Sequence, residues 1–238
     1  MGAEALIRWR HPELGIITPD KFIPVAEETG LIVPMGSWVL RQACTQLRLW
    51  NDSGITGLRL GVNISGRQFR EADLADIVAD CISETGVNAK DLDLELTESM
   101  LMADGEGTLK LLRSLAKLGV TLSIDDFGTG YSSLAYLKRF PVDTVKIDRA
   151  FVRDLDQDED GRVLVNAIIS LAHSLSLKTI AEGVETETQA ALLARHGCDE
   201  IQGYMIGRPM AVADFTTFAR SYSPRGPEKV AVLRAGQN

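Results

Sequence analysis

The sequence predicts an α/β protein built as a (β/α)₈ barrel. Short apolar runs alternate with longer stretches of helical periodicity along almost the whole chain, a pattern typical of parallel strands joined by right-handed crossovers. In addition, almost every predicted strand ends on a polar or charged side chain, as expected at the mouth of a barrel. A doubly wound sheet is the alternative, but the sequence has no Gly-rich phosphate loop of the kind that accompanies many such sheets.

Seven strands and seven helices are expected in alternation. The strands are expected at 3–9, 58–64, 91–97, 120–125, 143–148, 177–182 and 199–202. The helices are expected near 36–51, 71–85, 105–118, 131–139, 158–175, 186–195 and 211–221. Within the third helix, Leu109, Leu112 and Leu115 recur on one face, as in a helix that covers a sheet. Because such a barrel has eight strands, we expect the first N-terminal strand to be missing from this chain.

The composition is that of a globular protein. Hydrophobic residues make up 45% of the chain and charged residues 24%, a balance that excludes disorder as the main state. The formal net charge of −8 disfavours binding to duplex nucleic acid or to anionic membranes. No uncharged apolar run approaches the roughly 18–20 residues of a membrane helix, and the start of the chain lacks the basic region of a signal peptide.

Domain organisation and cysteine usage follow from the same inspection. Residues 1–222 are expected to form one domain, and residues 223–238, which contain Pro and Gly, a flexible C-terminal tail. The three cysteines, Cys44, Cys81 and Cys198, are far apart and fit neither a disulfide framework nor a zinc knuckle. We therefore expect buried cysteines in the core of a cytoplasmic protein.

Six oxygen-donor side chains stand at the ends of five predicted strands. They are Glu4, Asn63, Glu95, Asp125, Asp126 and Glu182. Divalent cations such as Mg²⁺ and Ca²⁺ prefer oxygen ligands, and five carboxylates in one mouth require a cation or a shared proton. An isolated Asp-Asp pair more often starts a turn or caps a helix, but its partners on four other strands favour a site for two metal ions.

Two basic residues could act beside these carboxylates. Lys146 lies inside a strand that otherwise reads as buried, and Asp148 shares its face of that strand. Such a lysine could orient a nucleophilic water, hold a phosphate or form a Schiff base. Arg8 suits a phosphate oxygen, although an outward salt bridge is equally consistent with its spacing. The residues alone predict a two-metal hydrolase acting on a phosphoester.

A series of short motifs extends in order from Glu4 to about Met210. They are Glu-Ala-Leu-x-Arg-Trp at 4–9, His-Pro at 11–12, Pro-x-Ala-Glu at 24–27, Asn-Ile-Ser at 63–65, Glu-Leu-Thr-Glu at 95–98, Asp-Asp-Phe-Gly-Thr-Gly at 125–130, Lys-Ile-Asp at 146–148, Ala-Glu-Gly-Val-Glu at 181–185 and Gln-Gly-Tyr at 202–204. In this order they resemble the EAL-domain family of bacterial cyclic-di-GMP-specific phosphodiesterases. The resemblance implies a TIM-like barrel whose first strand, normally some 25 residues before the Glu-Ala-Leu motif, is absent here.

The resemblance also implies roles for the matching side chains. The first metal would be bound by Glu4, Asn63, Glu95 and Asp125. Asp125 would bridge to the second metal, which Asp126 and Glu182 would help to hold. Lys146 would hydrogen-bond the nucleophilic water, acting in catalysis with Glu182 and Asp126. The substrate-binding residues would be Arg8, Asp148 and Gln202, the last within the shell of metal-bound water. Glu98 would anchor the loop at 125–130.

The implied reaction is hydrolysis of cyclic-di-GMP to linear pGpG. Two Mg²⁺ or Mn²⁺ ions per site would support the reaction and Ca²⁺ would inhibit it. The implied partners are the substrate, a second copy in a homodimer, and upstream sensor or GGDEF domains of a longer parent protein. The alternatives are a catalytically silent cyclic-di-GMP receptor or protein-interaction module and, less favoured, a Schiff-base aldolase that uses Lys146.

Overall fold

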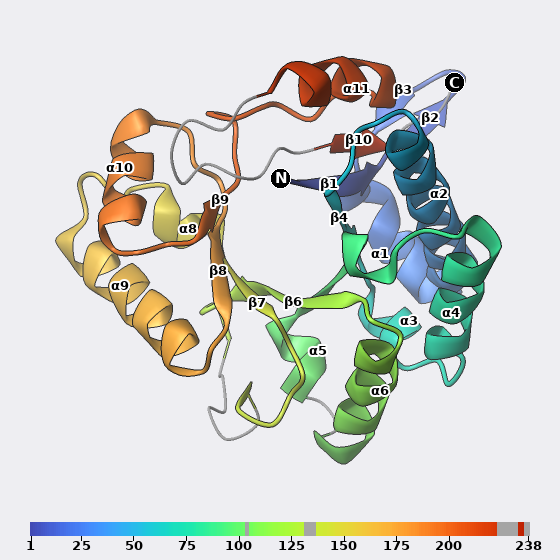
Figure 1. Cartoon of the computed structure of the whole chain (residues 1–238), viewed down its shortest axis with the longest axis horizontal. Coiled ribbons are helices and arrows are strands. Elements are labelled where there is room, and N and C mark those ends of the chain that lie inside the picture. The colour runs from blue at the N-terminus through green and yellow to red at the C-terminus, as the bar shows by residue number, and fades with distance from the viewer. Residues whose placement is uncertain (103–104, 131–136, 223–232, 236–238) are drawn as a thin grey trace.

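A curled parallel sheet surrounded by helices forms the body of the protein (Figure 1). The computed structural model describes residues 1–102, 105–130, 137–222 and 233–235. The strand order is β10-β1-β4-β5-β6-β7-β8-β9, with every hydrogen-bonded pair parallel. The strands are β1 (Gly2–Ile7), β4 (Arg59–Asn63), β5 (Leu92–Thr97), β6 (Thr121–Phe127), β7 (Thr144–Ile147), β8 (Lys178–Ala181), β9 (Glu200–Ile201) and β10 (Leu233–Ala235). The predicted barrel class and all seven predicted strands are confirmed.

Strand β10 is the part of the sheet that the sequence did not predict. It comes from the expected C-terminal tail and pairs in parallel with β1, with Ala5 opposite Leu233. It therefore occupies the place beside β1 at which we expected a strand to be missing. Residues 223–232 and 236–238 lie outside the described residues, so the flexibility of the tail and the domain boundary at 222 stay predictions.

The long helices lie on the outside of the curled sheet (Figure 1). They are α1 (Pro19–Thr29), α2 (Ile32–Asp52), α4 (Leu74–Thr85), α6 (Gly105–Lys117), α9 (Glu159–Ser174), α10 (Glu187–Arg195) and α11 (Val212–Ser221). Shorter helices are α3 (Gly66–Phe69), η1 (Ala89–Asp91), α5 (Glu98–Met102) and α8 (Arg149–Val152). Six of the predicted helices are observed within a few residues of their expected bounds. The predicted helix at 131–139 lies mostly outside the described residues.

The segment between β1 and α2 differs from the prediction. The expected strand at 3–9 ends at Ile7, and a separate hairpin of β2 (Trp9–His11) and β3 (Gly15–Ile17) follows it. Helix α1 is not among the expected helices, and it contains Pro24, a residue type that disfavours helix interiors. Its beginning does carry a signal, since Thr18 precedes a proline in the first turn, where proline is tolerated.

Apolar side chains between the sheet and the helices form the core. Leu109, Leu112 and Leu115 of α6 are all buried, as the one-face spacing predicts. The three cysteines are free and buried, also as expected. No helix in the described part of the chain combines the length and apolar character needed to cross a membrane.

Helix α11 closes the outer layer by returning to α2. The rings of Trp50 and Phe215 lie 5.1 Å apart, and Phe215 is fully buried. The indole Nε1 of Trp50 donates a hydrogen bond to Thr216 Oγ1 at 2.9 Å. This contact joins an early helix to the last described helix of the chain and ties the helical layer together beside β10 and β1.

Truncating a leucine of this core should destabilise the domain. We expect Leu112→Ala to lower the free energy of unfolding by about 2–5 kcal/mol, because the fully buried side chain leaves a cavity. Leu49→Ala, at an exposed position of α2, is the matched control and should change it by less than about 0.5 kcal/mol. Urea unfolding measures both values, and equal values for the two variants would contradict the packing described here.

Candidate active site at the carboxyl ends of the strands

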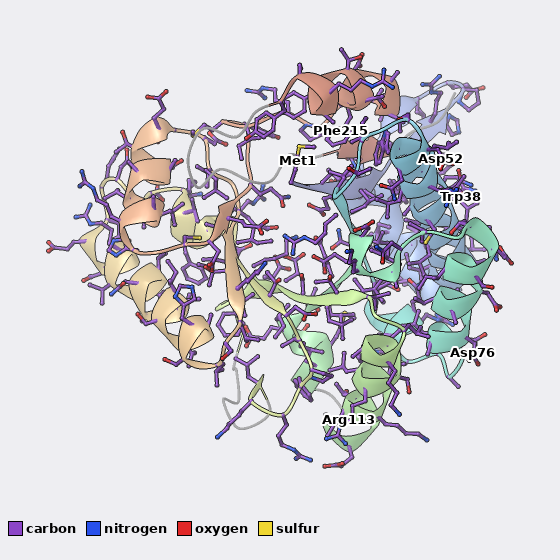
Figure 2. The ribbon with its side chains drawn as sticks, in the orientation of Figure 1. Met1, Trp38, Asp52, Asp76, Arg113 and Phe215 are labelled. Atoms are coloured by element: carbon purple, nitrogen blue, oxygen red, sulfur yellow. The ribbon has the colours of Figure 1, made fainter. Side chains whose placement is uncertain are left out.

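A buried lysine lies among the carboxylates of two neighbouring strands, β5 and β6, and of the segment after β8. The Nζ atom of Lys146, on β7, is 2.7 Å from Glu182 Oε1, 2.8 Å from Glu95 Oε2 and 3.3 Å from Asp125 Oδ1. Its side chain is 1% exposed. Because the strands are parallel, their carboxyl ends reach the same edge of the sheet and bring these residues together. Side chains from the strands fill the interior of the barrel (Figure 2).

A second set of contacts joins β1 to its neighbours on both sides. Glu4 Oε1 accepts a hydrogen bond from Asn63 Nδ2 at 2.6 Å, and its Oε2 accepts one from Gln202 Nε2 at 2.7 Å. Asn63 ends β4, and Gln202 directly follows β9. Both Glu4 and Gln202 are buried. The two amides thus fix both oxygens of the Glu4 carboxylate.

Two backbone features make room for the carboxylates. A Cβ atom at Gly61 would lie 2.2 Å from Glu95 Oε1, so this position of β4 tolerates no side chain while Glu95 points inward. Asp126 has φ of 53°, a left-handed conformation that Asp tolerates better than most residues. The pairing of β6 with β7 shifts register between Ile124 and Phe127, which allows consecutive aspartates to leave the regular pleat.

The charges of the site shift the pKa values of its members. Burial alone would lower the pKa of Lys146, but the surrounding carboxylates, Glu95 foremost, raise it well above its usual value. Burial also raises the pKa of Glu95, which Lys146 opposes. Burial raises the pKa of Glu182 to about 7, again against the effect of Lys146. The lysine is therefore an ammonium ion, whereas Glu182 can exchange a proton near neutral pH.

Asp126 and Asp148 interact through their side chains. Burial, the charge of Asp125 and the hydrogen bond with Asp148 raise the pKa of Asp126 to about 6. Asp148 also caps α8, because its Oδ1 accepts a hydrogen bond from the amide of Ala150 at 2.8 Å. The predicted face-sharing of Asp148 with Lys146 therefore coincides with a structural role at the start of a helix.

The remaining predicted residues lie near the same edge. Glu98, the buried first residue of α5, accepts a hydrogen bond from the amide of Gly128 at 3.0 Å. This contact ties α5 to the loop after β6, and the anchoring role of Glu98 stays a prediction. Arg8 follows β1 and donates from Nη1 to the carbonyl of Ile7 at 2.7 Å. The contact of Arg8 with a substrate stays a prediction.

The donor set fits divalent cations in its chemistry. Five carboxylates (Glu4, Glu95, Asp125, Asp126 and Glu182) surround one ammonium ion, which leaves an excess of negative charge. Asp125 Oδ1 is buried and accepts no hydrogen bond from the described residues. A cation bound by these oxygens would offset the excess negative charge and would also give Asp125 Oδ1 a partner. Within the described residues, however, no three Asp, Glu, His or Cys side chains are already arranged around a common metal position.

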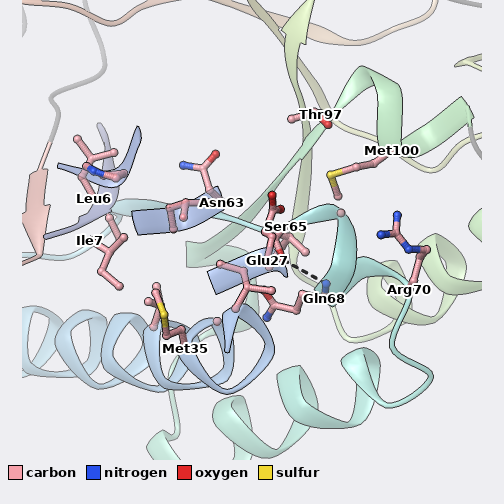
Figure 3. A pocket seen from close by; sticks show the side chains of 18 of the residues that line it. Leu6, Ile7, Glu27, Met35, Asn63, Ser65, Gln68, Arg70, Thr97 and Met100 are labelled. Carbon is pink, nitrogen blue, oxygen red and sulfur yellow. Dashed lines mark hydrogen bonds between the residues drawn. The ribbon is translucent and has the colours of Figure 1, made fainter. Parts of the chain in front are cut away.

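A cavity of about 540 Å³ adjoins this cluster on the side of β1 (Figure 3). Aliphatic side chains of β1, α1 and α2, among them Leu6, Ile7 and Met35, line much of it, and Asn63 connects it with the carboxylates. Gln68 lies in its wall and is 2% exposed, yet its Nε2 has no hydrogen-bond partner among the described residues. An unsatisfied buried amide next to a cavity is positioned to bind a polar group of a ligand.

Sequence reasoning missed this cavity and Gln68. The available signal was Ser65, whose Oγ accepts from the amide of Gln68 at 3.1 Å and caps α3 (Figure 3). A serine followed three residues later by glutamine reads as a helix start, which explains the spacing without any ligand. The cavity itself depends on α1, the helix that the sequence did not predict.

The fold and this edge define an EAL domain: the EAL domain family profile matches residues 1–209, and the chain belongs to that family. A protein of Pseudomonas aeruginosa named bifunctional diguanylate cyclase/cyclic di-GMP phosphodiesterase MucR is 50% identical over 88% of this chain and 31% of its own length. The cyclic di-GMP phosphodiesterase PdeR of Escherichia coli is 42% identical over 93% of this chain and 33% of its own length. The chain therefore spans about a third of these relatives.

A solved structure gives the same result at the level of the fold. The structure described as the MucR phosphodiesterase in complex with c-di-GMP superimposes with a TM-score of 0.87 at 49% identity. The match covers 90% of this chain and 87% of that one.

Ionisation of Glu182 should lower the stability of the metal-free domain. The folded state binds this proton more tightly than the unfolded state, because the pKa of Glu182 is about 7 instead of 4.5. The resulting stabilisation is present below pH 4.5 and is lost as the pH rises to about 7, on the order of 1–3 kcal/mol. Urea unfolding across this range should show a weaker decline in Glu182→Gln than in the parent. An identical decline would contradict the raised pKa.

Proposed function

We propose that this domain hydrolyses cyclic-di-GMP to linear pGpG in a reaction that depends on divalent cations. The observation that carries the proposal is the buried Lys146 among Glu95, Asp125 and Glu182, next to Glu4 at the mouth of an EAL-family barrel. The names of MucR and PdeR support the substrate and the activity.

We assign the cation-binding role to the oxygen donors described above. Glu4, Asn63, Glu95 and Asp125 would hold one ion, and Asp125, Asp126 and Glu182 a second. Two bound Mg²⁺ or Mn²⁺ ions would lower the pKa of a water and offset the negative charge of the phosphodiester. Because Ca²⁺ accepts longer and looser coordination, we expect it to occupy the site without supporting turnover.

The residues of the chain would perform the remaining chemistry. Lys146 stays protonated and places a positive charge where the transition state becomes most anionic. Glu182, whose Oε1 lies 2.7 Å from Lys146 Nζ, is placed to orient the attacking water beside this lysine. The amide of Gln202 holds Glu4 in place from the opposite side. Arg8 and Asp148 would contact the substrate beside this edge.

The cavity beside β1 would accept one base of the dinucleotide. Its aliphatic walls provide an apolar surface for a planar ring, and the free Nε2 of Gln68 can donate to a base carbonyl. Its position next to Asn63 would place the base beside the carboxylates that bind the cations. This arrangement supports a nucleotide substrate over a simple phosphoester.

Two alternatives make different demands on the same residues. A catalytically silent receptor would use the cavity and the site without turnover, and product analysis separates it from an enzyme. A Schiff-base aldolase would need an unprotonated Lys146, which the raised pKa of this lysine disfavours. We also propose that the domain acts in the cytoplasm as a homodimer and belongs to a longer protein with sensor or GGDEF domains.

Removing a proposed metal ligand should abolish turnover. We expect Glu4→Ala and Asp125→Ala to reduce Mn²⁺-dependent formation of pGpG by more than about 100-fold, because each loses a ligand of the cations. Chromatography of the products measures this. The control is Glu106→Ala, which removes an exposed glutamate of α6 paired with Arg139 and should keep the parental rate. Near-parental rates in Glu4→Ala would refute the metal assignment.

Loss of the Gln68 amide should weaken substrate binding more than catalysis. We expect Gln68→Leu to raise KM for cyclic-di-GMP by about 10-fold with kcat within a few fold, because a hydrogen bond to a base would be lost at a distance from the reacting phosphate. Steady-state kinetics at saturating Mn²⁺ separate the two constants. A fall in kcat with KM unchanged would place Gln68 outside the base-binding cavity.

A further inference from the structure

Strand β9 carries a site residue but has little backbone pairing of its own. It consists of Glu200 and Ile201 and pairs only with β8 in the described sheet. Gln202 follows directly, and its amide reaches Glu4 on β1, on the side of β9 that has no paired strand. Something other than a strand ladder must therefore set the distance between β9 and β1.

An ion pair spans this side below the mouth of the barrel. Arg59, the first residue of β4, has its Nη2 atom 2.8 Å from both carboxylate oxygens of Glu200. The side chain of Glu200 is 8% exposed and that of Arg59 22%. Strands β4 and β9 are not neighbours, because β5, β6, β7 and β8 lie between them in the sheet order. The pair thus connects β4, the third strand from one end of the curled sheet, with β9 at the other end.

This connection lies below the amides that hold Glu4. Side chains an even number of residues apart on a strand share a face, so Glu200, two residues before Gln202, lies on its face, and Arg59, four residues before Asn63, lies on the face of Asn63. Strands β4 and β9 are consequently joined at two levels. The lower level is the Arg59–Glu200 ion pair, and the upper level is the chain of hydrogen bonds from Asn63 through Glu4 to Gln202.

The backbone contacts around β9 lead in the other direction. The amide of Gln202 donates to the carbonyl of Ala181, and the amide of Thr179 donates to Asp199 Oδ2. Both contacts fix β9 on β8. They leave the distance from β9 to β1 undetermined, whereas the Arg59–Glu200 pair acts along that direction.

We propose that Arg59 and Glu200 form a positioning pair for the active site, which holds β9 so that Gln202 meets Glu4. The inference rests on the proposed function for its effect on cation binding. Exposed ion pairs contribute little to stability. Glu200 is buried, so removal of Arg59 leaves its carboxylate charge unpaired and away from water. Strand β9 then moves outward and Gln202 withdraws from Glu4. The Trp50–Thr216 contact between α2 and α11 does not involve either partner of this pair.

Hydrogen exchange tests the positional part without any activity. In Arg59→Met we expect amides at 200–206 to exchange at least about 10-fold faster than in the parent, while those at 212–221 keep their rates. The control is Arg48→Met, which removes an exposed Arg–Asp pair of 3.0 Å on α2 and should leave 200–206 unchanged. Unchanged exchange at 200–206 in Arg59→Met overturns the proposal.

A double-mutant cycle tests whether Arg59 acts through Gln202. The measured quantity is the affinity for Mn²⁺ in the absence of substrate. Arg59→Met should weaken this affinity about 10–100-fold, as does the loss of a residue that holds a metal ligand in place. Arg59→Lys should recover part of the affinity. In a Gln202→Ala background, Arg59→Met should cause no further loss. Additive losses overturn the proposal. If the parent makes no pGpG, the proposed function fails, while the exchange experiment still decides the positional role.

Discussion

The interaction on which the site depends is the burial of one ammonium ion among carboxylates that could not share the space without it. Lys146 is almost inaccessible to water, and its Nζ contacts side chains from β5, β6 and the segment after β8. Burial penalises the charge of the lysine and the charges of its partners alike, and their mutual attraction offsets part of this penalty. The lysine thereby fixes where Glu95, Asp125 and Glu182 stand before any cation binds.

A single positive charge does not balance this set, and the imbalance links structure to function. The pKa of Glu182 is raised to about 7 and that of Asp126 to about 6, because burial and neighbouring acids disfavour their charged forms. Groups that titrate near neutrality can move protons. The same excess of negative charge attracts cations, so proton transfer and metal binding would arise from one electrostatic cause.

Sequence reasoning recovered the barrel and the carboxylate set because parallel strands place their carboxyl ends together. Once the strands ending at Asn63, Glu95 and Asp125 were identified, their convergence followed from topology alone. What could not be predicted depends on packing between distant segments. Helix α1, which contains Pro24, and the cavity that it lines were not predicted. The pairing of Arg59 with Glu200 joins residues 141 positions apart, and no local sequence pattern indicates it.

Product analysis of cyclic-di-GMP incubated with the purified domain tests the proposed function most directly. Linear pGpG should form in the presence of Mn²⁺ or Mg²⁺ and should no longer form when EDTA removes the metal. Equal formation of pGpG with and without EDTA would contradict the assignment of the carboxylates to cations. Binding of cyclic-di-GMP without any product, at any Mn²⁺ concentration, would contradict the assignment of Lys146 and Glu182 to catalysis.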